Sequence, residues 1–245
     1  MFEINIFLKN LYNELMKVAF LDIDKTLYNG YLFYEWARYM ENKGIFSFID
    51  FAKFQEIGVF YELGAVDYTK AATMTSEVIG EVLKDNKFDV VIKHTQNFID
   101  SVKNRYFDYS PAIIKYLKKQ GYLIVFVTTE PDFLAEMVKA QIGGDDAIGI
   151  DYTVKEGLFT GELTNDLFSQ FGKANTVSKF AKEHGLNMEE CFSMGDSEGD
   201  IEMLKLTGRS VIINTSGQIK ELIRDTKIIQ ARREMVLEDM VMTGV

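Results

Sequence analysis

The sequence is poor in cysteine, histidine and proline: it has one, two and two of these residues among 245. The single cysteine, Cys191, excludes an internal disulfide, and its neighbour Phe192 favours a reduced thiol in the protein core. His94 and His184 lie among polar neighbours in segments of helical character, which favours surface positions. Acid-base or metal chemistry is therefore expected from carboxylates, and the chain has 37 aspartates and glutamates.

The sequence also lacks a basic surplus and a long apolar run. Its 27 lysines and arginines leave a net charge of -10, and they are scattered, which argues against non-specific nucleic-acid binding. No apolar run approaches the roughly 20 residues that span a bilayer. Residues 1–17 lack a basic leader and a small-residue cleavage site. We expect an amphipathic N-terminal helix, no membrane or nucleic-acid partner and a cytoplasmic location; nothing indicates the oligomeric state.

What the sequence does have is an alternation of short apolar runs with helical patterns. The continuous apolar run at 17–22 is typical of a strand in a parallel sheet covered on both faces. Further strands are expected at 122–128, 190–194, 209–213 and 227–229, with a hairpin of strands at 147–154 and 158–163. Helices are expected at 111–121, from Pro131 onward, and at 173–184, 199–206 and 216–224. This alternation indicates βαβ crossovers and a doubly wound parallel sheet.

Residues 31–105 contain no comparable strand. Their apolar residues recur at helical spacing, as Trp36 and Met40 do, so we expect a helical insert of about 70 residues. We therefore predict an α/β fold in which residues 1–30 and 106–245 form a Rossmann-like core with a doubly wound parallel sheet. Residues 31–105 would form an inserted helical cap domain.

Polar residues follow several of the predicted strands, where the ligands of open α/β sheets bind. They are Asp22, Asp24 and Thr26 after the first strand, Thr128 and Thr129 after the second, and Asp196 and Asp200 after the strand at 190–194, with Lys173 at a helix start. Carboxylates gathered at one edge require a hard divalent cation, and oxygen ligands fit magnesium better than zinc. A lysine and hydroxyls supply the charge and donors that a phosphate dianion requires. One carboxylate then serves as nucleophile and its neighbour as acid and base.

Four motifs in this order resemble those of the haloacid dehalogenase superfamily. They are Asp-x-Asp-x-Thr at Asp22, Asp24 and Thr26, a strand ending at Thr128, the lysine Lys173, and Gly-Asp-x-x-x-Asp at Gly195, Asp196 and Asp200. The helical insert between the first two motifs marks the helical-cap branch. Stretches such as "YELGAVDYTKAA" and "GLFTGEL" look like the phosphoserine-phosphatase-like subgroup.

The resemblance implies a phosphatase that acts on a small phosphorylated metabolite. Asp22 would attack phosphorus and form an aspartyl-phosphate, and Asp24 would protonate the leaving alcohol and then deprotonate the attacking water. The phosphoryl oxygens would be held by Thr128, with Thr129 as the alternative, and by Lys173. Lysines elsewhere in the second half of the chain, Lys155 and Lys179, compete with Lys173 for this role.

The resemblance also implies the metal and its ligands. Mg²⁺ would be held by Asp22, by the backbone carbonyl of Asp24 and by Asp196, with Asp200 in support. The same residues would serve a transferase that passes the phosphoryl group to an acceptor other than water. A non-catalytic protein that keeps the fold to bind a phosphorylated ligand or a protein partner is the third alternative.

Two positions depart from the phosphoserine phosphatases. Those enzymes carry a glutamate nine residues after the nucleophile, where this chain has Tyr31, and their second motif continues Gly-Gly, where this chain has Thr and Glu at 129–130. The mouth of the predicted pocket is aromatic, with Tyr28, Tyr31, Phe33 and Tyr34. Such a mouth favours a larger or less polar leaving group than serine.

Overall fold

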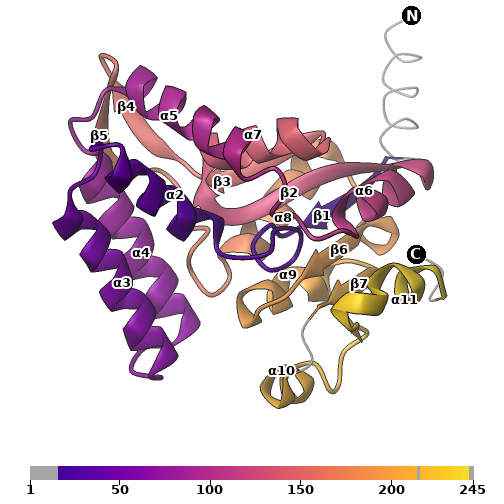
Figure 1. The fold of residues 1–245 in the computed structure, drawn as a ribbon. Coiled ribbons are helices and arrows are strands. Elements are labelled where there is room, and N and C mark those ends of the chain that lie inside the picture. The colour runs from indigo at the N-terminus through magenta and orange to yellow at the C-terminus, as the bar shows by residue number, and fades with distance from the viewer. Residues whose placement is uncertain (1–15, 214–215, 243–245) are drawn as a thin grey trace, which may run out of the picture.

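The computed structural model describes residues 16–213 and 216–242, and a central parallel sheet organises them (Figure 1). The six strands lie in the order β3-β2-β1-β6-β7-β8. Their bounds are β1 Lys17–Leu21, β2 Tyr122–Pro131, β3 Asp146–Ile150, β6 Phe192–Gly195, β7 Arg209–Ile212 and β8 Ile229–Gln230. From β1 the chain fills one half of the sheet and then returns to fill the other, so the predicted doubly wound sheet is confirmed.

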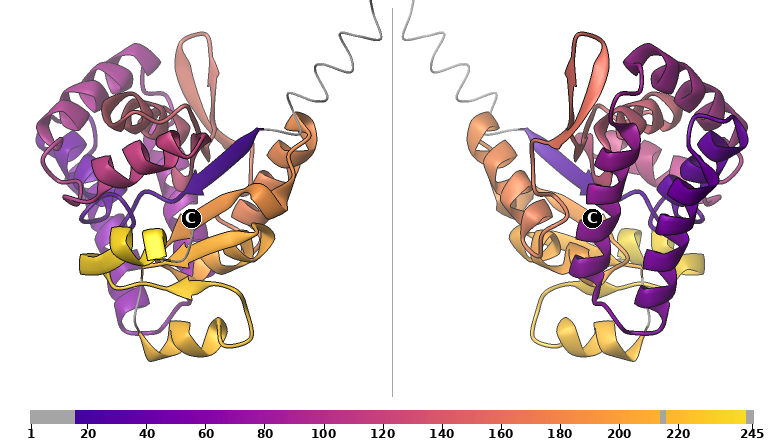
Figure 2. Two further views of the ribbon diagram at one scale, coloured as in Figure 1. Left: turned by 90° about the vertical axis from the view of Figure 1, so that its right-hand side faces the viewer. Right: turned by 90° about the vertical axis from the view of Figure 1, so that its left-hand side faces the viewer.

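Helices cover both faces of this sheet, which explains why its strands are continuous apolar runs. Figure 2 shows α7 (Asp132–Ile142) on one side of the sheet and α8 (Gly172–His184) on the other. The other helices that follow residues 31–105 are α6 Ser110–Lys119, α9 Ile201–Leu206, α10 Gly217–Leu222 and α11 Val236–Met242. Short 3-10 turns lie at Met188–Glu190, Glu198–Asp200 and Arg233–Met235. The helices expected from residue 111 onward are therefore present, with ends that shift by a few residues.

Four helices lie within residues 31–105, as the helical patterns predict. They are α2 Leu32–Asn42, α3 Phe48–Glu62, α4 Tyr68–Leu83 and α5 Phe88–Ser101. The long helices α3 and α4 pack side by side, away from the sheet, whereas α5 packs against α7 (Figures 1 and 2). One cluster of buried apolar side chains runs through these helices and the sheet. The division into a core and a cap domain at residues 31–105 stays a prediction.

The predicted hairpin at 147–154 and 158–163 is only half right. The structure splits its first strand into β3, which joins the edge of the main sheet, and β4 (Tyr152–Lys155), which alone pairs with β5 (Leu158–Leu163). Gly149 permits this, because a Cβ there would lie 2.6 Å from the carbonyl oxygen of Glu130. The break falls at the exposed Asp151, which interrupts an otherwise strand-like run and was read as part of one strand.

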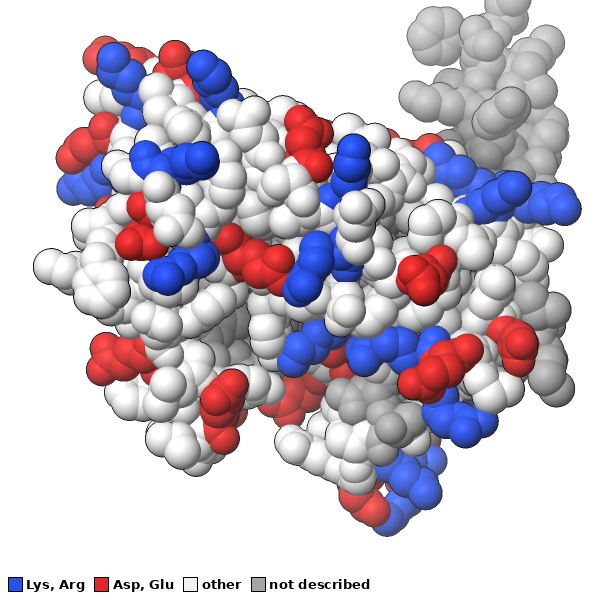
Figure 3. All heavy atoms as spheres, in the orientation of Figure 1, with Lys and Arg blue, Asp and Glu red and all other residues white. Residues whose placement is uncertain are grey.

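The remaining expectations concern the ends and the surface of the molecule. The amphipathic helix expected at the N-terminus falls outside the described residues. Within residues 16–213 and 216–242, no helix combines the length and the apolar character that crossing a membrane requires. Figure 3 shows lysine and arginine side chains interspersed with aspartate and glutamate on the face drawn. Cys191 is buried in the core, as predicted.

Candidate active site

The site lies at the switch point of the sheet, where β1 and β6 are neighbours and the chain leaves them in opposite directions. Asp22 follows β1, and its backbone N–H donates to the carbonyl of Met194 in β6 at 2.9 Å. Asp196 follows β6. The fold therefore brings together two carboxylates that are 174 positions apart in the sequence (196 − 22).

Asp22 is buried and accepts two hydrogen bonds from side chains. Thr26 Oγ1 donates to Asp22 Oδ2 at 2.8 Å, and Lys173 Nζ donates to Asp22 Oδ1 at 2.6 Å. Burial raises the pKa of Asp22 to about 7, with the charges of Asp200 and Asp24 acting in the same direction and Lys173 opposing them. The first motif and the lysine predicted from the sequence thus meet at one carboxylate.

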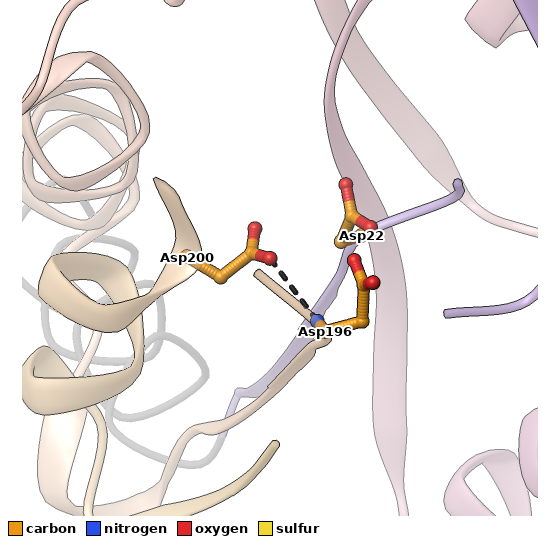
Figure 4. Close-up of side chains that lie close together, drawn as sticks. All are labelled: Asp22, Asp196 and Asp200. Atoms are coloured by element: carbon orange, nitrogen blue, oxygen red, sulfur yellow. Dashed lines mark hydrogen bonds between the residues drawn. The ribbon is translucent and has the colours of Figure 1, made fainter. Parts of the chain in front are cut away.

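Lys173 also binds Asp200, and Asp200 organises the loop after β6. The distance from Lys173 Nζ to Asp200 Oδ1 is 2.6 Å. The other oxygen, Oδ2, accepts from the backbone N–H of Asp196 at 3.1 Å and from the N–H and hydroxyl of Ser197 at 2.9 and 2.8 Å (Figure 4). A Cβ on Gly195 would lie 2.5 Å from the Asp200 side chain, so this approach requires glycine. Both oxygens of Asp200 are therefore engaged in orienting other groups.

Asp22, Asp196 and Asp200 form a candidate metal centre. One oxygen from each lies within 4.8 Å of the others, and Figure 4 shows the three side chains side by side. Burial raises the pKa of Asp196 well above its usual range, and the charges of Asp22 and Asp200 add to the effect. Buried oxygen donors that repel one another in this way fit a hard divalent cation.

The Asp24 side chain contacts different groups from those that hold Asp22. Its Oδ1 accepts the backbone N–H of Leu32, the first residue of α2, at 2.9 Å. Burial raises its pKa to about 6, and hydrogen bonds with Glu130 and Leu32 moderate the rise. Its carboxyl group is not part of the cluster of Asp22, Asp196 and Asp200. The metal role expected for Asp24, through its backbone carbonyl, stays a prediction.

Glu130 belongs to the site, although the sequence marked it only as a departure from relatives. It is 3% exposed, and its Oε1 accepts the backbone N–H of Phe33 at 3.0 Å. Burial, and then the charge of Asp24, raise the pKa of Glu130 well above its usual range. Its position at the end of β2 was the signal that could have identified it. Tyr68 on α4 lies in the stretch "YELGAVDYTKAA", whose resemblance to the subgroup was its signal in the sequence. It packs so closely on Gly199 that a Cβ on Gly199 would lie 2.2 Å from the Tyr68 ring.

A cavity of about 550 Å³ opens onto these groups. Thr128 and Thr129 both line it, and Thr128 is buried near the end of β2, while their role toward a phosphate stays a prediction. On the opposite wall α3 and α4 contribute mainly apolar and aromatic side chains, with those of the segment after Gly30: Tyr31, Phe33, Tyr34, Phe54, Ile57, Tyr61, Tyr68. Figure 3 shows the hollow between this wall and α10 at the lower edge of the view. The cavity is therefore polar on the side of the strand ends and aromatic on the opposite wall, which we call its aromatic roof.

The competing lysines lie away from this cavity. Lys155 is exposed on the β4–β5 hairpin and pairs with Glu162, and Lys179 is exposed on α8. Lys25 reaches the mouth, where its ammonium group lies 3.9 Å from the centre of the Tyr31 ring. Among the three lysines that the sequence offered for the phosphate, only Lys173 contacts the site residues in the described structure.

A family model matches the chain over residues 19–205, and its description is haloacid dehalogenase-like hydrolase. The chain belongs to this family. The predicted family is thereby confirmed, and the predicted enzyme class, a phosphatase, is supported by this family together with relatives named phosphoserine phosphatase. The match spans the first motif, the helical insert, Lys173 and the loop after β6 of this hydrolase.

Relatives of this haloacid dehalogenase-like hydrolase bear related names. The phosphoserine phosphatase SerB1 of Mycobacterium tuberculosis is 26% identical over 86% of this chain and 69% of its own length. The phosphoserine phosphatase of Methanocaldococcus jannaschii is 31% identical over 44% of this chain and 51% of its own length.

Solved structures show the same fold. A phosphoserine phosphatase with an analogue of the phospho-aspartyl intermediate aligns with a TM-score of 0.61 and 24% identity over 91% of this chain and 98% of that one. A protein of unknown function from Bordetella pertussis aligns with a TM-score of 0.74 and 20% identity over 87% of this chain and 98% of that one. These likenesses establish the Rossmann-like core with its helical insert.

Proposed function

We propose that this hydrolase is a magnesium-dependent phosphomonoesterase that works through an aspartyl-phosphate. The observation that carries the proposal is the separation of two neighbouring carboxyl groups. Asp22 is held by Lys173 and Thr26, whereas Asp24 is held by the start of α2. Groups of one type in different surroundings are suited to different roles, here nucleophile and acid-base catalyst.

The reaction follows from these placements. A carboxylate oxygen of Asp22 forms a bond to phosphorus while the bond from phosphorus to the ester oxygen breaks, and Asp24 gives its proton to that oxygen. Asp24 then takes a proton from water as the water oxygen bonds to phosphorus. The acyl-phosphate bond breaks, phosphate leaves and the Asp22 carboxylate is restored. Lys173, Thr128 and Thr129 hold the phosphoryl oxygens.

Magnesium would bind at the carboxylate cluster. Asp22, Asp196 and the backbone carbonyl of Asp24 would be its ligands, and Asp200 would support them because its own oxygens already hold Lys173 and the loop after β6. The ion supplies positive charge that draws the phosphoryl oxygens to Asp22 and relieves the repulsion among the carboxylates. The oxygen-only donor set supports this choice of ion.

The substrate is a small phosphorylated metabolite, and the names of the relatives support phosphoserine as a candidate. The aromatic roof of the cavity favours a less polar leaving group. We expect kcat/KM for phenyl phosphate to exceed that for phosphoserine by at least about tenfold, which corresponds to about 1.4 kcal/mol of differential transition-state binding. A preference for phosphoserine in this comparison would show that the roof does not select the leaving group.

The deciding experiment measures free phosphate released from p-nitrophenyl phosphate at neutral pH, with Mg²⁺ and with excess EDTA. The wild type should release phosphate only with Mg²⁺, and Asp22→Asn should fall to the EDTA background. Asp108→Asn, which changes an exposed aspartate, is the matched control and should behave as the wild type. Folded wild-type protein that releases no phosphate from any of a panel of esters would overturn the proposal. Release of p-nitrophenol without free phosphate, and only after an alcohol acceptor is added, would favour a phosphotransferase, because the phosphoryl group then stays on the acceptor.

A further inference from the structure

Carboxyl groups of the core hold the first turn of helix α2. The first N–H groups of a helix have no partner within the helix, and Tyr31, which precedes α2, provides no side-chain cap. Instead, Leu32 N–H donates to Asp24 Oδ1 at 2.9 Å, and Phe33 N–H donates to Glu130 Oε1 at 3.0 Å. Negative groups at this end also interact favourably with the helix dipole.

These two bonds join segments that are distant in the sequence. Phe33 and Glu130 are 97 positions apart, and the second bond ties the start of the helical insert to the end of β2. The first bond ties the same helical turn to Asp24, in the loop after β1. Leu32 and Phe33 are adjacent in the first turn of α2, so a bond that fixes the position of the Phe33 N–H also fixes the position of the Leu32 N–H, which binds Asp24. The orientation of Asp24 therefore depends on where α2 begins.

Glu130 is buried, and its backbone is fixed by a hydrogen bond at the end of β2. It is 3% exposed, its own N–H donates to Thr128 Oγ1 at 3.3 Å, and it lines the same cavity as Asp24. Its buried Oε2 accepts no hydrogen bond from a donor among the described residues, and its carboxyl group shares a hydrogen bond with the Asp24 carboxyl group. A glutamate is costly to bury, so its presence calls for a use that an apolar residue would not serve.

We propose that Glu130 is a positioning residue, which binds Phe33 N–H, fixes the first turn of α2 and thereby orients the Asp24 carboxyl group for its proton transfers. This inference rests on the proposed phosphatase function. Asp24 matters most when the leaving group is an alkoxide, which must be protonated as it departs. A nitrophenolate leaves without a proton. Loss of the oxygen with which Glu130 binds the Phe33 N–H should therefore lower kcat/KM more for alkyl phosphates than for p-nitrophenyl phosphate.

The test compares Glu130→Met with Glu130→Gln on β-glycerophosphate and on p-nitrophenyl phosphate. Methionine has a similar length but no acceptor, whereas glutamine retains a carbonyl oxygen for Phe33 N–H. We expect Glu130→Met to lose at least about tenfold more kcat/KM on the alkyl ester than on the aryl ester, within the range that acid catalysis contributes. Glu130→Gln should keep the wild-type ratio to within about threefold. Glu136→Ala, on the exposed side of α7, controls for charge loss.

A second readout does not depend on activity. Hydrogen exchange of the Leu32 and Phe33 amides should be faster in Glu130→Met than in the wild type and unchanged in Glu130→Gln. Glu130→Ala provides the same comparisons if the methionine variant does not fold. Equal losses on both esters, or unchanged exchange, would refute the positioning role while wild-type activity preserved the proposed function. A wild type that is inactive on both esters would refute the proposed function, and the exchange data would still decide what holds α2.

Discussion

Replacing Lys173 by methionine removes a cation that binds two of the clustered carboxylates. Lys173 is 4% exposed, and its ammonium group lies 2.6 Å from oxygens of both Asp22 and Asp200. Burial alone would lower its pKa, but Asp200 and Asp22 outweigh burial and hold the pKa well above its usual range. The substitution leaves the buried carboxylates of Asp22 and Asp200 without the positive charge that Lys173 provides. Breaking a buried ion pair in this way costs about 3–5 kcal/mol.

The loss is measurable as a fall in Tm. A chain of this length shifts by about 2–4 °C for each kcal/mol, so Lys173→Met should unfold about 6–20 °C below the wild type in EDTA at pH 8. The loss should shrink at pH 5, because protons on the carboxyl groups then remove the uncompensated charge. Mg²⁺ should raise the Tm of the variant more than that of the wild type, since the ion neutralises the same carboxylates.

Thermal unfolding followed by circular dichroism measures these effects, with Lys179→Met as the matched control. Lys179 lies on the same helix, α8, but is exposed, and methionine has a helix propensity close to that of lysine. A Tm of Lys173→Met within about 2 °C of the wild type at pH 8 in EDTA would refute the reasoning, as would an equal fall for Lys179→Met.

Two further predictions concern pH and packing. In the metal-free protein the pKa values of Asp22 and Asp24 are raised from 3.8 to about 7 and about 6, so stability should fall as pH rises from 4 to 7, and Mg²⁺ should raise Tm more at pH 8 than at pH 5. Equal Mg²⁺ shifts at the two pH values would contradict this. In urea denaturation, Gly80→Ala should destabilise by about 1–3 kcal/mol, because its Cβ would lie 2.5 Å from the carbonyl oxygen of Gly161. Gly58→Ala should stabilise the protein by up to about 1 kcal/mol, because a Cβ at residue 58 would meet no neighbouring atom within 4 Å. If both alanine variants changed the free energy of unfolding in the same direction, packing around the new Cβ would not be what decides their effects.

The carboxyl ends of the strands were predictable from local sequence. Asp22 and Asp196 each follow a buried apolar run, and parallel strands place such ends at one edge of a sheet. Their convergence therefore required only the strand assignments and the doubly wound topology. Choosing Lys173 over Lys155 and Lys179 required the order of the motifs as well, because each of the three lysines resembles a surface charge when read alone.

The contacts between the insert and the core were not predictable in the same way. Glu130 meets Phe33, and Tyr68 packs on Gly199, because helices α2 and α4 return to the strand ends, and no local pattern encodes that return. The boundary between β3 and β4 was missed for a related reason. Gly149 is read as part of a continuous strand until the chain at 130–132, against which it packs, is known.

The two aspartates of the first motif divide the site between core and insert. Asp22 is held by Thr26 and Lys173, which belong to the sheet side of the molecule, whereas Asp24 is held by Leu32 and faces Glu130. The side chains that hydrogen-bond the nucleophile therefore lie outside the helical insert, whereas the backbone N–H that holds the acid-base group belongs to the insert. A change in the insert should then alter the hydrolysis of esters that need protonation before it alters attack on phosphorus, so leaving-group dependence is the property through which this insert controls the chemistry.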